Sequence, residues 1–393
     1  MPRWSDHAIF WQVYPLGFTG APRRADGTPP RHRLTQCAQW LDYAVELGCN
    51  ALLLGPVFAS ETHGYDTVDH FRIDPRLGDD NDFDELVSAA RDRGVHVVLD
   101  GVFNHAGRSF THPEWLRADA TFEGHDHLPA LAHDEPAVAD HVVAVMSHWL
   151  ERGVSGWRLD AAYAVPTSFW ARVLARVRER HSRAWFVGEV IHGDYAGYAT
   201  AAGLDSVTQY ELWKAIWSSL NDANFHELAW AVKRHNEIVE TVTPMTFVGN
   251  HDVTRLASKL TDERHIGHAL AILFGVAGVP CVYSGDEQAF RGIKEDRAGG
   301  DDEIRPAFPA DPAGLAPYGW PTYRLHQRLI GQRRRNPWLV RARTTVEHLT
   351  NRAIALRSSG AHGEELLILL NLADEPYRFP TGDRVEAHSW LTR

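Results

Sequence analysis

Short apolar runs with strand character alternate with amphipathic segments along most of this chain of 393 residues. Eight such runs lie at residues 8–14, 51–57, 95–100, 156–160, 184–189, 204–210, 245–250 and 278–285. Segments with helical spacing separate them, among them Leu34–Leu47, Phe83–Arg93, Ala137–Glu151 and Ser168–Arg180. Strands that alternate with helices form parallel sheets, so eight such units predict an α/β fold, a (β/α)8 TIM barrel.

An open, doubly wound parallel sheet is the structural alternative. Such a sheet normally carries a glycine-rich phosphate-binding loop after its first strand. The first apolar run here leads into "VYPLGFTGAP" (13–22), which is not a loop of that kind. The sequence therefore favours the barrel.

Two regions depart from the alternation. Residues 106–136 are rich in His, Asp, Pro and Gly, which is typical of a loop subdomain inserted after the third strand. After about residue 338 the pattern changes to short strand-like runs, "AIALRSS" and "ELLILLNLA". We therefore expect a catalytic barrel over residues 1–338, with a short insertion at 106–136, and a small C-terminal β domain over 339–393.

Charge and segment composition limit the possible partners and location. The formal net charge is −11, whereas a nucleic-acid-binding surface requires clustered basic residues. The sequence contains no secretory leader and no apolar stretch long enough to span a membrane. Its cysteines, Cys37, Cys49 and Cys281, lie in or beside apolar segments, as expected of buried free thiols. These features predict a cytoplasmic protein without nucleic-acid or membrane partners.

Charged and polar side chains gather where the predicted strands end. In a barrel, the carboxyl ends of the strands meet on one rim, and active sites lie there. Any one of these residues could be a helix cap, but burying all of them is costly unless they are paired or used. The residues concerned are Asp100, Asn104, His105, Arg158, Asp160, Glu189, His251 and Asp252.

The spacing of Arg158 and Asp160 suggests how this rim could act. Side chains two positions apart in a strand share a face, so both point to the same side. We expect the guanidinium to lower the pKa of Asp160, as a nucleophile requires, and the resulting charge to raise the pKa of Glu189, as a general acid requires. Such a carboxyl pair suits cleavage of a glycosidic bond.

Four segments resemble, in order and spacing, the short motifs of the α-amylase family, glycoside hydrolase family 13. They are "DGVFNH" (100–105), "GWRLDAA" (156–162), "GEV" (188–190) and "FVGNHD" (247–252). "LPALAHDEPAV" (128–138) and "GEVIHGDY" (188–195) resemble the neopullulanase and cyclomaltodextrinase members most closely. Those members usually carry an extra N-terminal domain, which we expect to be absent because the first strand begins near residue 8.

The resemblance implies roles for individual side chains. It makes Asp160 the nucleophile, Glu189 the acid and base, and Asp252 a third carboxylate that binds sugar hydroxyls. We add Trp115, in the insertion, as a candidate sugar platform, whereas Trp157 and Trp170 are expected in the core. Asp302 competes with Asp301 for the position beside Arg305. The other residues implied to bind substrate are Tyr65, His105, Arg158, His251, Asp301 and Arg305.

Three positions depart from the family pattern. Many members carry a lysine–histidine pair where this chain has Tyr163 and Ala164, and calcium-binding members carry an aspartate where it has Ala130. Asn104 could still bind a hard cation, but further oxygen ligands are not evident. We therefore expect no cofactor, with calcium not favoured, and no metal site among the histidines of 105–141.

These observations predict a retaining hydrolase of α-1,4-glucosidic bonds in malto-oligosaccharides or cyclodextrins. A glucanotransferase or an α-glucosidase shares the first half-reaction, so the motifs leave both open. Ala161 favours α-1,4 over α-1,6 specialists, which often have valine there. A non-catalytic carbohydrate-binding relative would typically have lost one of the three carboxylates. The oligomeric state stays open, with a monomer favoured.

Overall fold

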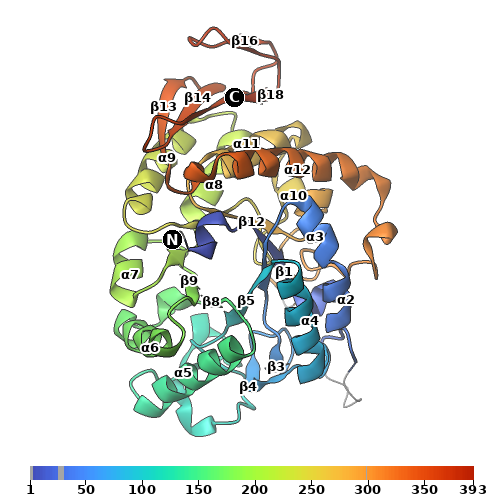
Figure 1. The fold of residues 1–393 in the computed structure, drawn as a ribbon, viewed down its shortest axis with the longest axis vertical. Coiled ribbons are helices and arrows are strands. Elements are labelled where there is room, and N and C mark those ends of the chain that lie inside the picture. Colours follow the sequence, from blue (N-terminus) through green and yellow to red (C-terminus); the bar gives the residue numbers. More distant parts are fainter. Residues whose placement is uncertain (1–2, 25–30, 298) are drawn as a thin grey trace.

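The computed structural model describes residues 3–24, 31–297 and 299–393 (Figure 1). The barrel strands are β1 (Phe10–Val13), β2 (Ala51–Leu54), β5 (His96–Gly101), β8 (Gly156–Leu159), β9 (Trp185–Gly188), β10 (Ser206–Val207), β11 (Met245–Phe247) and β12 (Val279–Tyr283). They form one eight-stranded parallel sheet in the order β10-β9-β8-β5-β2-β1-β12-β11. A parallel bridge between Thr208 and Met245 joins the two end strands, which confirms the predicted barrel.

Helices surround this sheet, and the predicted helical segments are confirmed with small shifts (Figure 1). The segment expected over 34–47 is two helices that meet at Trp40. The next helix begins at Asp80 because the Asp79 side chain accepts the N–H groups of Asn81 and Asp82. The helices are α1 (Pro15–Phe18), α2 (Leu34–Gln39), α3 (Leu41–Leu47), α4 (Asp80–Asp92), α5 (Pro136–Glu151), α6 (Thr167–Arg180), α7 (Tyr195–Ala202), α8 (Tyr210–Asn221), α9 (His226–Val239), α10 (Leu256–Lys259), α11 (Ile266–Gly275) and α12 (Trp320–Arg335).

The barrel interior changes from apolar to polar along the strands. Phe10 and Val98 belong to the apolar cluster that fills the barrel. Two residues further along the same strands, and so on the same face, are Gln12 and Asp100, both buried. In β8, Trp157 and Leu159 join the separate core between the sheet and the helices, whereas Arg158 faces the barrel. This alternation is what places polar groups together at the carboxyl ends of the strands.

The insertion after β5 carries a small antiparallel pair, β6 (Leu116–Thr121) and β7 (Pro129–Leu131). An antiparallel bridge between His105 and Ala130 fixes β7 against the end of β5. A second pair, β3 (Phe58–Ser60) and β4 (Thr67–Ile73), follows β2. Both pairs lie beyond the carboxyl ends of barrel strands, so they can shape the rim.

A four-stranded antiparallel sheet follows the barrel. Its strands are β13 (Arg343–Leu349), β14 (Ala353–Ser359), β15 (Glu365–Asn371) and β18 (Ser389–Thr392), and a hairpin of β16 (Tyr377–Arg378) and β17 (Arg384–Val385) precedes β18. The two apolar runs predicted to be strands are β14 and β15. The sheet packs over α11 (Figure 1), where a Cβ on Gly275 would come within 2.4 Å of the Ile368 side chain. This close approach requires glycine.

The cysteines and helices agree with the expectations from sequence. Cys37, Cys49 and Cys281 are all buried and unpaired. Burial raises the pKa of Cys37 to about 12, so its thiol stays protonated. Within the described residues, none of the helices has the length and apolar character that crossing a membrane requires.

Candidate active site

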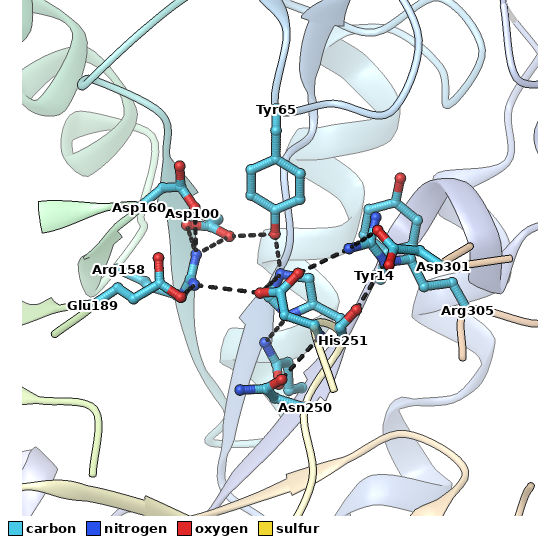
Figure 2. A network of polar contacts seen from close by, with 12 residues as sticks. Tyr14, Tyr65, Asp100, Arg158, Asp160, Glu189, Asn250, His251, Asp301 and Arg305 are labelled. Carbon is cyan, nitrogen blue, oxygen red and sulfur yellow. Dashed lines mark hydrogen bonds and ion pairs between the residues drawn. The ribbon is translucent and has the colours of Figure 1, made fainter. Parts of the chain in front are cut away.

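Arg158 stands at the centre of the polar rim, surrounded by four carboxylates (Figure 2). Its Nη1 donates to both carboxylate oxygens of Asp100 at 2.7 Å and to Oδ1 of Asp160 at 3.2 Å. Its Nη2 lies 2.7 Å from Oε1 of Glu189 and 3.9 Å from Oδ2 of Asp252. We call these five residues the Arg158 cluster. Since the arginine side chain is only 3% exposed, these carboxylates supply the counter-charge that its burial requires.

The electrostatics of Asp160 correct the prediction from sequence. Burial raises its pKa well above the ordinary value, and the charge of Glu189 raises it further, although Arg158 opposes both effects. The direction predicted for Arg158 is confirmed, because the guanidinium lowers this pKa, but burial and the charge of Glu189 outweigh it. The net shift is therefore upward, and the contact of Arg158 with Asp160, at 3.2 Å, is longer than its contacts with Asp100 and Glu189, at 2.7 Å.

Asp252 has the opposite character. Burial alone would raise its pKa, but His251, Arg305 and Arg158 together hold it below the ordinary value. Arg305 donates from Nη2 to Oδ1 at 2.8 Å, and Nε2 of His251 lies 3.0 Å from Oδ2. At 28% exposure, its side chain is the most open carboxylate of the Arg158 cluster. Asp252 is thus held ionised at the mouth of the site.

His251 is held as a neutral ring of defined tautomer. Burial lowers its pKa to about 3. The Tyr65 hydroxyl donates to Asp100 at 3.0 Å, so it accepts from Nε2 of His251, to which it is hydrogen-bonded. The amide Nε2 of Gln12 lies 2.9 Å from Nδ1 of His251 and donates to it. The rings of Tyr65 and His251 are stacked with their centroids 5.5 Å apart, which makes a flat wall beside Asp252.

Asp301 and Arg305, which the family resemblance implies to bind substrate, also lie at the site. Arg305 Nη2 lies 2.9 Å from Oδ2 of Asp301, and its Nε donates to the carbonyl oxygen of His251 at 2.8 Å (Figure 2). Asp302 contacts Arg305 only between backbone groups, through its carbonyl oxygen. The guanidinium also lies over the ring of Tyr14, 4.7 Å from its centroid. Of Asp301 and Asp302, Asp301 is therefore the one whose side chain pairs with Arg305, which also pairs with Asp252.

His105 comes from the start of the insertion and is buried. Its ring stacks on Phe122 with centroids 4.5 Å apart, and its Nδ1 lies 3.0 Å from Nδ2 of Asn104. Its Nε2 has no hydrogen-bond partner within the described part of the chain. Burial lowers its pKa to about 3, so the ring is neutral. An unsatisfied buried nitrogen at this rim could bond a substrate hydroxyl.

The structure does not bring Trp115 to the Arg158 cluster. Its indole stacks on His112 at 3.9 Å and lies 5.1 Å from the ring of His141, in an aromatic group beside α5. Trp157 and Trp170 are fully buried, as expected. Of the aromatic residues in the insertion, Phe122 is the one that contacts a residue at this rim.

Sequence reasoning missed several residues that position Glu189. The Tyr210 hydroxyl donates to Oε1 of Glu189 at 3.2 Å and accepts from Nδ2 of Asn250 at 2.9 Å. The N–H of Ala161 donates to Oε2 at 2.8 Å, and this alanine has a left-handed φ of 45°. Strained backbone at such a point is typical of functional sites. Tyr210 and Gln12 each lie in one of the eight apolar runs predicted to be strands. A polar side chain within such a run is the sequence feature that could have pointed to them.

Asn104 is the residue that the sequence left open as a ligand of a hard cation. Its amide nitrogen is engaged with His105, and Ala130 offers no side-chain oxygen. Among the described residues, the groups of His, Cys, Asp and Glu that could share an ion do not include any residue of 104–134. Calcium prefers six to eight oxygen ligands, and the expectation that this protein needs no calcium stays a prediction.

Comparison with known proteins decides the family. The profile described as "Alpha amylase, catalytic domain" matches residues 12–120 and 109–350. The chain belongs to the α-amylase family. It is 29% identical over 343 residues to a cyclomaltodextrinase from Bacillus sp, an alignment that covers 74% of this chain and 61% of that protein. The chain thus spans about 61% of the length of this relative.

Two further relatives of the α-amylase family match over more of their length. A 4-alpha-glucanotransferase from Thermotoga neapolitana is 27% identical, with 89% of this chain and 93% of that protein covered. The cyclic alpha-maltosyl-(1→6)-maltose hydrolase of Arthrobacter globiformis is 25% identical and superposes with a TM-score of 0.84, over 100% of this chain and 99% of that one. The resemblance stated from the sequence motifs is thereby confirmed.

Proposed function

We propose that this member of the α-amylase family is a retaining glycoside hydrolase that cleaves α-1,4-glucosidic bonds in malto-oligosaccharides or cyclodextrins. The observation that carries the proposal is the grouping of Asp160, Glu189 and Asp252 around Arg158 at the carboxyl ends of the barrel strands. Relatives named as a cyclomaltodextrinase and a cyclic maltosyl-maltose hydrolase support the substrate class.

In the proposed reaction, Asp160 attacks the anomeric carbon while Glu189 protonates the leaving oxygen. Water then hydrolyses the glycosyl–enzyme bond, with Glu189 acting as base. The attack requires an ionised Asp160, and the Arg158 guanidinium favours that form against the effect of burial. Glu189 must also leave its contacts with Arg158 and the Ala161 N–H to reach the glycosidic oxygen.

The remaining residues would bind the sugar at the cleavage point. Asp252, held ionised by Arg305, would accept hydrogen bonds from sugar hydroxyls that strengthen in the transition state. The stacked rings of Tyr65 and His251 offer a flat surface for the sugar, and Nε2 of His105 offers one polar contact. Arg305 and Asp301 would keep Asp252 in place.

Transfer to a sugar acceptor is the second candidate function, because the alignment with the 4-alpha-glucanotransferase covers 93% of that protein. The acceptor side of the site carries Tyr163, three residues after Asp160. Its hydroxyl donates to Glu123 of the insertion at 2.7 Å. An aromatic side chain there could stack on an acceptor sugar and favour it over water.

The experiment is to incubate the protein with maltose to maltoheptaose, cyclodextrins, pullulan and isomaltose, and to follow products by chain length and by NMR. Hydrolysis predicts shorter sugars that first appear as α-anomers, whereas transfer also predicts products longer than the substrate. A β-anomer as first product would contradict the retaining mechanism. Absence of turnover by the folded protein on the whole panel would contradict the proposal.

We also propose that the protein acts in the cytoplasm, since its three cysteines are buried and unpaired, as suits a reducing compartment. We further propose that residues 1–338 form the catalytic unit and residues 339–393 a separate β domain. The second sheet begins at Arg343, just after this boundary.

A further inference from the structure

A second group of ligating side chains lies where the barrel meets the C-terminal sheet, outside the Arg158 cluster. Asp262 caps a short 3-10 turn (Glu263–His265) before α11, His265 is the last residue of that turn, and His388 directly precedes β18. Nε2 of His265 lies 3.1 Å from Nδ1 of His388, and Oδ2 of Asp262 lies 4.0 Å from each of these nitrogens. We propose that these three side chains bind a zinc-like divalent cation that ties the C-terminal sheet to the barrel.

The distances suit a tetrahedral ion. With bonds of about 2.0–2.1 Å to zinc, ligand atoms of a tetrahedron lie about 3.3 Å apart. The two histidine nitrogens are already at 3.1 Å, and Oδ2 of Asp262, now 4.0 Å from each, must approach by about 0.7 Å, a movement that a side-chain rotation can supply. Two imidazoles and one carboxylate are typical zinc ligands, and water can complete the tetrahedron.

The tautomer of His388 leaves its Nδ1 free to bind a metal ion. Its Nε2 lies 2.8 Å from Oδ1 of Asp374, so this nitrogen carries the proton and donates it to the carboxylate. The lone pair of Nδ1 is then directed toward His265 and Asp262. A metal-binding histidine commonly donates its other N–H to a carboxylate in this way.

His265 is prepared for a ligand as well. Its side chain is only 7% exposed, and burial is the largest of the effects that lower its pKa. The neutral imidazole is the form that binds metals.

The backbone conformation of His388 also indicates that this residue has a functional role. Its φ is 46°, in the left-handed region that few residues other than glycine adopt, and its N–H bonds the carbonyl oxygen of Ala373 at 3.2 Å. Strained positions of this kind concentrate where a side chain must be aimed. The strained turn directs the imidazole at the barrel.

Arg264 is the competitor for this site. Its Nη2 lies 2.6 Å from the same Oδ2 of Asp262 that the ion would use. The Arg264 side chain is 59% exposed, so it can turn into solvent at little cost. Metal binding would therefore replace this ion pair, and removing the arginine should strengthen binding.

The test uses the full chain, purified without a histidine tag, stripped with EDTA and desalted. Titration with ZnCl2 is followed by calorimetry and by the melting temperature, and Co²⁺ is used as an absorbing substitute. We expect one Zn²⁺ per chain, a higher Tm with Zn²⁺, and visible Co²⁺ absorption of a four-coordinate site. Ca²⁺ and Mg²⁺ should not compete, since both prefer oxygen ligands.

Variants locate the site. His388→Asn keeps a residue that tolerates left-handed backbone and should weaken zinc binding at least 100-fold, whereas Asp374→Asn should weaken it 10- to 100-fold. Arg264→Gln should tighten it severalfold. His362→Asn, which removes an exposed histidine from the turn between β14 and β15, is the matched control and should change nothing.

The outcomes separate this proposal from the proposed function. Zinc binding that is absent, or equally tight in His388→Asn, would overturn it, as would Ca²⁺ binding as tightly as Zn²⁺. If His388→Asn fails to fold, Asp374→Asn and the Co²⁺ spectrum of the unmodified chain decide. Oligosaccharide cleavage by the zinc-loaded variants should match that of the unmodified chain, because none of these residues belongs to the Arg158 cluster.

Discussion

Nη1 of Arg158 lies 2.7 Å from both carboxylate oxygens of Asp100, closer than its 3.2 Å contact with Asp160. Asp100 is almost fully buried, and burial raises its pKa to about 6 despite the arginine. Asp100 is therefore the residue that fixes the guanidinium, which in turn faces Asp160 and Glu189. It acts as a positioning residue.

Asp100→Asn should test this positioning. The amide keeps the shape but loses the charge that holds Arg158, so we expect kcat to fall about 10- to 100-fold, equivalent to about 1.4–2.7 kcal/mol, with a smaller change in KM. Asp205→Asn is the matched control. Asp205 is paired with Arg178 at 2.7 Å and, like Asp160, has a side chain that is 9% exposed. An unchanged kcat in folded Asp100→Asn would refute the role.

The roles of Asp160 and Glu189 predict different substrate dependence. Asp160→Asn and Glu189→Gln should each lower kcat/KM for maltotriose at least 10³-fold, since both residues act at the chemical step. An aryl α-glycoside with a good leaving group needs little protonation. It should recover much of its rate in Glu189→Gln but none in Asp160→Asn. Equal recovery in both variants would contradict the division of roles, and circular dichroism checks the fold.

Asp252 should matter mainly in the transition state. Asp252→Asn keeps the size of the side chain but removes the charge that Arg305 and His251 face. We expect kcat to fall at least 100-fold while KM changes by less than tenfold, because the lost contacts strengthen as the transition state forms. Steady-state kinetics on maltotriose measure both. A rise in KM at constant kcat would instead indicate ground-state binding.

The short insertion predicts that kcat/KM reaches a plateau at short oligosaccharides, because few remote surfaces can bind a long chain. Phe122→Ala removes the ring that supports His105 and should lower kcat/KM about tenfold at every substrate length. Trp115→Ala removes packing against His112 and should lower Tm with little effect on the length profile. A selective loss on maltoheptaose in Trp115→Ala would instead place that indole on the substrate.

Buried histidines predict a measurable pH effect. Burial lowers the pKa of His326 to about 4, against about 6.5 in an unfolded chain. Between about pH 4 and pH 6.5 the unfolded state binds a proton on this histidine that the folded state does not bind. Lowering the pH from 7.5 to 5.5 therefore reduces the free energy of unfolding by about 1.4 kcal/mol through His326. In His326→Gln this loss should be absent, so the free energy of unfolding, measured with urea, should fall by that much less between pH 7.5 and 5.5 than in the unmodified chain. His362→Asn, at an exposed position, should show no such difference.

Calcium should have no effect on stability. The prediction rests on Ala130, which offers no side-chain oxygen where calcium-binding members of the family carry an aspartate. After EDTA treatment and desalting, adding CaCl2 should leave Tm unchanged, whereas ZnCl2 should raise it. A calcium-dependent rise in Tm would show that these positions misled the prediction.

Several features could be derived from the order of residue types alone. The eight apolar runs predicted the barrel, because alternation of strands and helices leaves few other ways to bury both faces of a sheet. The positions of Asp160, Glu189 and Asp252 after separate strands predicted their meeting, because the carboxyl ends of parallel strands share one rim. Local pattern and chain direction were enough for both.

Other features depended on distances that no local pattern encodes. The raised pKa of Asp160 follows from its burial and from the charge of Glu189, which outweigh the Arg158 guanidinium, and both effects depend on how the rim packs. Gln12 and His251 are 239 residues apart, and His265 and His388 are 123 apart, so their pairing exists only once the barrel closes and the second sheet docks. Sequence determined which groups could meet, and tertiary packing decided which of them touch, because hydrogen bonds and ion pairs depend steeply on distance.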